Sequence, residues 1–230
     1  MVVSQKKYTA MNLNSLQLHR ITFLSLSFSV VILIIRFYLA DSFHYAFMVW
    51  NLFLAVIPYV ISSWLLSTNW IRKEAFPLVL VLGIWLLFLP NAPYLITDLM
   101  HLHRTQTSLL WIDHFMLFAF AWNGLFIGII SMLQVFRILI DKWNLITAKR
   151  LLFIIVFLCG FGIYLGRFQR WNSWELFNNP FVLLYDCCRC LIHPEYRGQT
   201  WAITLGFGSF LWISFMTAHT LLPIKKASQK

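Results

Sequence analysis

Residues 83–101 read Gly-Ile-Trp-Leu-Leu-Phe-Leu-Pro-Asn-Ala-Pro-Tyr-Leu-Ile-Thr-Asp-Leu-Met-His. In this stretch an apolar helical run meets two prolines, Pro90 and Pro93, which lack an amide donor and clash with the preceding turn. Asn91 between them is a residue type that caps helix starts, and Pro93 suits a first helical turn. We therefore predict that a membrane span ends at Pro90 and that a separate helix covers residues 94–102.

Polar side chains share one face of that second helix, because Tyr94, Asp98 and His101 recur at i, i+4 and i+7. Ionisable groups beside a break in a membrane span are costly, so their presence indicates a site. Asp98 and His101 are the candidate catalytic residues, as an acid–base pair or as metal ligands. The alternative is that they bond each other or cap backbone at the break. Their spacing matches no strong metal signature, so we predict no metal site, and the sequence assigns no cofactor.

The composition excludes a soluble domain, because hydrophobic residues make up 60% of the chain and charged residues only 11%. Several apolar runs reach the roughly 20 residues that a helix needs to cross a bilayer. These runs are continuous and do not alternate, which argues against a membrane β-barrel. We predict an all-α, polytopic membrane helix bundle that forms one domain over residues 1–230. Its six spans are expected at about residues 21–39, 43–66, 76–89, 114–136, 151–167 and 201–222.

The distribution of basic residues predicts the orientation. The net charge of +10 comes from lysines and arginines in short loops, which is typical of the positive-inside rule and argues against nucleic-acid binding. With both termini cytoplasmic, 12 of the 18 lie inside, namely Lys6, Lys7, Arg20, Arg72, Lys73, Arg137, Lys142, Lys149, Arg150, Lys225, Lys226 and Lys230. The six outside are Arg36, Arg104, Arg167, Arg170, Arg189 and Arg197. Most acidic residues also lie outside, so we expect the functional chemistry on the outer face of a bacterial inner membrane.

A second polar stretch, residues 162–175, reads Gly-Ile-Tyr-Leu-Gly-Arg-Phe-Gln-Arg-Trp-Asn-Ser-Trp-Glu. A continued helix would place Arg167 over Trp171 and Arg170 over Trp174, at i and i+4. Guanidinium groups beside tryptophan suit phosphate or carboxylate headgroups. The alternative is an aromatic belt with arginines that reach the headgroup layer. The density of polar groups favours a binding role.

Several other features receive structural interpretations. Asn172 and Glu175 match a capping box. The helix expected between the prolines at positions 180 and 194 is predicted to lie on the outer membrane surface. Its cysteines, at positions 187, 188 and 190, are interpreted as small apolar packing residues. Arg36, near the far end of the first span, is expected to reach the headgroups.

Two motifs carry a resemblance to a known family. They are Leu89-Pro90-Asn91-Ala92-Pro93-Tyr94 with Thr97-Asp98-Leu99, and Tyr164-Leu165-Gly166-Arg167 with Arg170-Trp171-Asn172-Ser173-Trp174. Over nearly the whole chain the sequence resembles domain of unknown function 1361, a family of bacterial multi-pass membrane proteins. The resemblance implies an integral bacterial membrane protein of this topology. It implies no substrate, cofactor or catalytic residue.

Three functions are compatible with these patterns. The first is a membrane protein that binds an anionic lipid headgroup or an envelope precursor through its outer-face arginines and tryptophans. The second is an outer-leaflet enzyme that uses Asp98 and His101. The third is a small transporter, suggested by the broken third span. The sequence assigns no oligomeric state.

We further predict that the two motifs meet, because Asp98 can neutralise Arg167 or Arg170 near hydrocarbon. A pocket on the outer half is then expected, lined by Asp98, His101, Arg167, Arg170 and Trp171. The full set of candidate ligand-binding residues is Asn91, Tyr94, Asp98, His101, Arg167, Arg170, Trp171, Asn172, Trp174 and Glu175.

Overall fold

The computed structural model describes residues 15–104 and 109–221, with the side chains of residues 15, 101–104 and 177 outside that description. The described residues form helices joined by short connections and contain no strand, which confirms the all-α prediction. The elements are α1 (Ser15–Ala40), α2 (Phe47–Ser67), α3 (Asn69–Lys73), α4 (Ala75–Phe88), α5 (Asn91–Tyr94), the 3-10 helix η1 (Leu95–Arg104), α6 (Leu110–Lys142), α7 (Leu145–Phe168), α8 (Glu175–Asn178), α9 (Pro180–Ile192) and α10 (Pro194–Leu221).

Six stretches within the described residues are long and apolar enough to cross a membrane, as predicted. They are Leu16–Ala40, Phe47–Ser67, Ala75–Met100, Leu110–Lys142, Leu145–Phe168 and Pro194–Leu221. Large apolar side chains such as Phe23 and Phe76 are exposed, at 69% and 81%. Such a surface belongs in a lipid bilayer, and the protein is a multi-pass integral membrane protein.

Five of the six spans are longer than predicted, and α6 and α10 show why. Helix α6 covers 33 residues. Asp113 near its start and Asp141 near its end lie within the helix, whereas the predicted span stopped short of both. Helix α10 begins at Pro194, although its first two turns are too polar to be recognised as part of a span. Proline is well suited to the first turn of a helix, which explains the early start.

The third span is interrupted as predicted, but it does not end at Pro90. Helix α4 stops at Phe88, a single turn of α5 follows, and η1 continues in 3-10 geometry in place of a regular α-helix. The apolar stretch that can cross a membrane runs on to Met100. The break therefore lies inside the span.

Close helix contacts hold the break in place. A Cβ on Gly124 of α6 would lie 2.3 Å from the carbonyl oxygen of Ala92, and one on Gly162 of α7 would lie 2.5 Å from Cγ of Pro90. Only glycine allows such an approach at these two positions. The broken segment is thus packed between α6 and α7.

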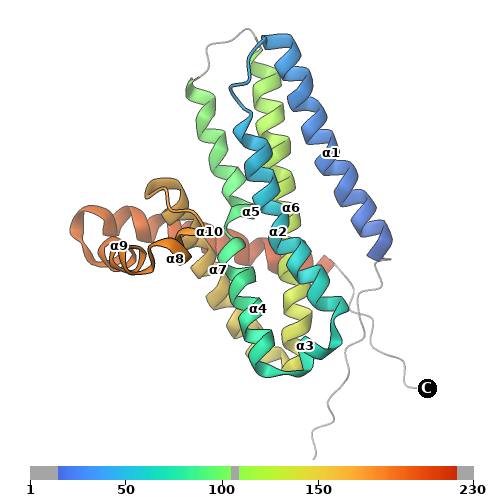
Figure 1. Ribbon diagram of the computed structural model, residues 1–230, viewed down its shortest axis with the longest axis vertical. Helices are drawn as coiled ribbons and strands as arrows, with labels where there is room; N and C mark the ends of the chain where they lie inside the picture. Colours follow the sequence, from blue (N-terminus) through green and yellow to red (C-terminus); the bar gives the residue numbers. More distant parts are fainter. Residues whose placement is uncertain (1–14, 105–108, 222–230) are drawn as a thin grey trace, which may run out of the picture.

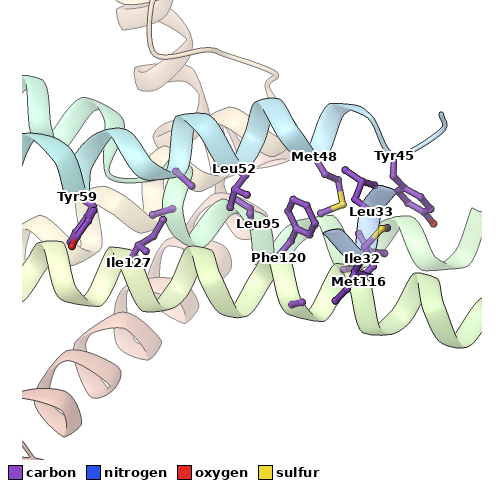
Figure 2. Packing of buried hydrophobic residues seen from close by; sticks show 14 of the residues in the cluster. Ile32, Leu33, Tyr45, Met48, Leu52, Tyr59, Leu95, Met116, Phe120 and Ile127 are labelled. Atoms are coloured by element: carbon purple, nitrogen blue, oxygen red, sulfur yellow. The ribbon is translucent and has the colours of Figure 1, made fainter. Parts of the chain in front are cut away.

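Buried side chains form two main clusters along α6. The first joins α1, α2 and α6, and Figure 2 shows Met48 and Leu52 of α2 facing Phe120 of α6, with Leu95 of η1 nearby. The second joins α4, α6, α7 and α10 and includes Trp85. Figure 1 shows α1, α2 and α6 along the long axis, whereas α10 runs across it. In the same view α5 lies about halfway along the bundle.

Candidate functional site

The end of α4 leaves backbone carbonyl groups that side chains then bind. The Nδ2 group of Asn91 donates to the carbonyl oxygen of Phe88 at 3.0 Å, and the hydroxyl of Ser173 donates to that of Leu87, also at 3.0 Å. Asn91 Nδ2 also lies 3.2 Å from Ser173 Oγ. Asn91 therefore serves the end of α4 and not the start of the next helix, where no side-chain cap is present. The last carbonyl groups of a helix have no partner within it, so side-chain donors such as Asn91 bind them.

The expected ion pair between the motifs is present. Nη1 of Arg167, in the last turn of α7, lies 3.1 Å from Oδ1 of Asp98 in η1. The second carboxylate oxygen accepts a hydrogen bond from Nδ2 of Asn51 in α2 at 2.9 Å. The Asp98 side chain is 1% exposed and the Arg167 side chain 15%. Three elements thus converge on one buried carboxylate.

The aromatic partner of Arg167 is not the predicted Trp171. Its guanidinium carbon lies 5.7 Å from the ring centroid of Tyr94, and Nη1 lies 3.4 Å from the Tyr94 hydroxyl. The tryptophan stacking would need α7 to continue, but the helix ends at Phe168. Arg170 takes a left-handed conformation with φ 60°, which is typical of a residue just past a helix end.

A pocket of about 160 Å³ lies beside the ion pair. Its lining is rich in aromatic and amide side chains: Trp50, Asn51, Asn91, Tyr94, Trp171, Asn172, Ser173 and Trp174. Asp98, Arg167 and Arg170 do not line this pocket. Asp98 is buried, and Arg170 is exposed because it follows the end of α7. Tyr94 and Asn51 connect the ion pair to the pocket, because each side chain contacts the ion pair and also lines the pocket.

Comparison with known proteins identifies the family. A family model described as "Protein of unknown function (DUF1361)" matches residues 50–214. The chain belongs to this family. The match contains both motifs and the whole pocket lining. No curated protein and no solved structure matches the chain.

Other predicted site residues of this DUF1361 protein have structural partners. The Glu175 carboxylate accepts a hydrogen bond from the backbone amide of Asn172, as half of a capping box. Nε1 of Trp171 donates to Oδ2 of Asp186 in α9 at 3.2 Å, which ties the pocket wall to that helix. The side chain of His101 lies outside the described residues. Among the side chains that are described, no group of three or more His, Cys, Asp or Glu is arranged to hold a metal.

The three cysteines of α9 differ in burial. Cys190 is buried, Cys187 is half-buried, and Cys188 is exposed. Burial is the main factor that raises the pKa of the Cys187 thiol to about 11. Burial also raises the pKa of Cys190, although a hydrogen bond with Tyr164 opposes the shift. At neutral pH both remain neutral thiols, a state suited to packing.

Sequence reasoning missed a second buried ion pair. Nε of Arg36 lies 2.9 Å from Oδ1 of Asp113, and the two side chains are 2% and 0% exposed. The prediction that Arg36 reaches the headgroups is therefore wrong. Its Nη1 also donates to the carbonyl oxygen of Ser42 at 2.9 Å, and its guanidinium carbon lies 4.7 Å from the ring centroid of Tyr45. The opposite charges of Arg36 and Asp113 were the only signal of this pair in the sequence, because 77 residues separate the two.

Proposed function

We propose that this DUF1361 protein binds the polar headgroup of a membrane lipid, or of a lipid-linked envelope precursor, in the pocket beside Tyr94. The observation that carries the proposal is the position of this pocket, at the junction between an interrupted membrane span and the end of α7. Apolar pockets with a few convergent polar groups are the usual form of a small-molecule site. Here tryptophans supply the apolar walls, and asparagines and a serine supply donors and acceptors.

The free donors of Arg167 favour a ligand with an anionic group. Its described hydrogen bonds use Nη1 alone, and within the described part of the chain Nε and Nη2 have no hydrogen-bond partner. The side chain is 15% exposed. A planar guanidinium with a free edge suits carboxylate or phosphate oxygens. Tyr94 lies between this arginine and the pocket and would relay the contact.

We place the pocket on the extracytoplasmic side of a bacterial inner membrane. The support is the excess of basic residues in the opposite connections, with Arg72 and Lys73 in α3 and Lys149 and Arg150 in the first turns of α7. Helix α7 crosses from that end to the pocket. Both termini are then cytoplasmic, a proposal that concerns segments outside the described residues.

The geometry supports binding better than catalysis. Both oxygens of Asp98 accept hydrogen bonds from Asn51 and Arg167, and the side chain is almost fully buried. A general acid or base must reach the group to which it transfers a proton, and Asp98 does not line the pocket. The interruption of the third span favours transport as the second candidate, since broken helices form solute sites in transporters.

Native mass spectrometry of the full chain in mild detergent tests the binding proposal. A Cβ on Gly166 would lie 3.5 Å from Cε2 of Tyr94, so the longer side chain of Gly166→Leu would fill part of the pocket. We expect this variant to lose co-purified lipid by about tenfold. The matched control is Gly83→Leu, because a Cβ on Gly83 would have no neighbour within 4 Å. Equal lipid retention by wild type and Gly166→Leu, at equal thermal stability, would contradict the proposal.

Transport makes a different prediction for the same pair of variants. A transporter in vesicles would move its solute across the bilayer, and Gly166→Leu would stop that flux. A binding protein would show lipid retention without flux. Measurement of both quantities in reconstituted vesicles separates the two candidates.

A further inference from the structure

A second cavity lies near one end of the bundle, between α3 and the last turn of α6. Its volume is about 330 Å³, and its lining consists of Asn69, Arg72, Lys73, Ile138, Asp141 and Lys142. Figure 1 shows α3 at the bottom of the view, well away from α5. We propose that this cavity binds a phosphate group, as the headgroup of an anionic phospholipid or as free phosphate.

Arg72 carries the strongest argument for an anion. Its Nη2 donates to Oδ1 of Asn69, and its Nη1 lies 3.9 Å from Oδ2 of Asp141. Its Nε is buried and has no hydrogen-bond partner among the described residues. A buried donor without a partner is rare in folded proteins. Nη1 also makes no hydrogen bond among the described residues, since 3.9 Å is too long for one, and a phosphate oxygen in the cavity would accept from this end of the guanidinium.

The charge of the cavity also suits an anion. Arg72, Lys73 and Lys142 bring three positive charges, and Asp141 brings one negative charge. Nζ of Lys142 donates to the carbonyl oxygen of Lys73 at 2.5 Å, which holds the two α-helix ends together and leaves its other protons free. Asp141 is half exposed, so water screens its repulsion of an anion. Glu74 follows in the chain but does not line the cavity.

Tryptophans place this cavity at the depth of lipid headgroups. Trp70 of α3 is 64% exposed, and Trp143, which follows α6, is 37% exposed. Exposed tryptophans in membrane proteins concentrate at the interface between hydrocarbon and water. Basic pockets at this depth bind the phosphates of anionic lipids. The inference is independent of the pocket beside Tyr94.

The test compares phosphatidylglycerol with phosphatidylcholine on the full chain by native mass spectrometry. Both lipids carry a phosphodiester, but only the first has a net negative charge. We expect wild type to retain phosphatidylglycerol about tenfold better than phosphatidylcholine. The double variant Arg72→Gln with Lys142→Gln, made in the Gly166→Leu chain so that the pocket beside Tyr94 does not contribute, should retain the two lipids equally. Arg150→Gln is the control, because Arg150 is exposed at the start of α7 and does not line the cavity.

Inorganic phosphate distinguishes the two sources of the ligand. If millimolar phosphate displaces phosphatidylglycerol from wild type, the cavity accepts the free anion, and if it does not, the lipid is required. Retention of phosphatidylglycerol by the double variant at the wild-type level would overturn the proposal. An equal loss in Arg150→Gln would overturn it as well. Thermal unfolding in phosphatidylcholine nanodiscs identifies a variant that has lost its fold, and Lys142→Gln alone then replaces the double variant.

Discussion

Two arginine–aspartate pairs of similar geometry occupy different surroundings. Arg36 and Asp113 join α1 to α6 at 2.9 Å, with exposures of 2% and 0%. Arg167 and Asp98 join α7 to η1 at 3.1 Å, with exposures of 15% and 1%. Each arginine also lies over a tyrosine ring, Tyr45 in the first pair and Tyr94 in the second. The chemistry is the same, but the second pair lies beside the pocket near Tyr94 and in a broken span.

This difference supports a structural role for the first pair and agrees with the binding role proposed for the site of the second. The enclosed arginine uses Nε for the carboxylate of Asp113 and Nη1 for the backbone of Ser42, so the protein occupies both sides of the guanidinium. The more open arginine, Arg167, leaves Nε and Nη2 without partners in the described residues. The family match also distinguishes them, because it begins at residue 50 and leaves Arg36 outside.

The largest effect is expected at the enclosed pair. Asp113→Leu leaves the Arg36 charge buried without its carboxylate, which costs about 3–5 kcal/mol of stability. Thermal and denaturant unfolding in detergent measure the loss. Arg36→Met, combined with Asp113→Leu, removes the unpaired charge and should restore much of the lost stability. The control is Asp41→Asn, an exposed carboxylate in a left-handed conformation that asparagine tolerates. A double variant no more stable than Asp113→Leu would contradict this account.

A smaller loss is expected at the open pair. Asp98→Asn keeps the shape of the side chain but removes its negative charge, so the ion pair becomes a hydrogen bond from charged Arg167 to a neutral amide, at a cost of about 2–3 kcal/mol. The partial exposure of Arg167 lets water compensate for part of the loss. Lipid retention should fall only slightly, because Asp98 does not line the pocket. An enzyme that used Asp98 would instead lose all turnover while it retained its ligand, so activity measured beside retention distinguishes the two.

Glycine contacts at the break provide a third comparison. In Gly162→Ala the new Cβ would lie 2.5 Å from Pro90, so the proline ring must shift, at a cost of about 1–2 kcal/mol. Gly166→Ala is the matched control, because its Cβ would meet Tyr94 at an ordinary 3.5 Å. We expect Gly162→Ala to lower the unfolding temperature. We also expect it to weaken the contact between Arg167 and Asp98 but not the one between Arg36 and Asp113. Equal stability of the two variants would show that the break tolerates displacement.

The sequence predicted features that depend on local chemistry. Proline removes hydrogen bonds wherever it stands, so the interruption near Pro90 was foreseeable. The pairing of Asp98 with an arginine of the second motif followed from charge and from the cost of leaving either one unpaired near hydrocarbon. Span number followed from hydropathy. These predictions needed no knowledge of which helices are neighbours.

The remaining features depend on tertiary contacts. Asn51 was recognisable as a polar residue in a span. Its hydrogen bond to Asp98 can be predicted only once it is known which face of α2 meets η1. Arg36 was expected at the headgroups because it lies near a helix end, and only its neighbour Asp113 on α6 reveals its burial. The placement of the arginines over the tryptophans was predicted from a continued α7, whereas the helix ends at Phe168 and Arg170 takes a left-handed conformation.

The smallest effect tests which part of Tyr94 holds the open arginine. The hydroxyl accepts from Nη1 of Arg167 at 3.4 Å, near the limit of a hydrogen bond, so Tyr94→Phe should cost only about 0.5 kcal/mol. The ring remains in that variant and keeps its contact with the guanidinium at 5.7 Å. Tyr38→Phe is the control, because the Tyr38 side chain is 88% exposed. If unfolding shows that Tyr94→Phe loses as much as Asp98→Asn, the hydroxyl and not the carboxylate positions Arg167. The open pair would then differ from the enclosed pair in its main partner and not only in its exposure.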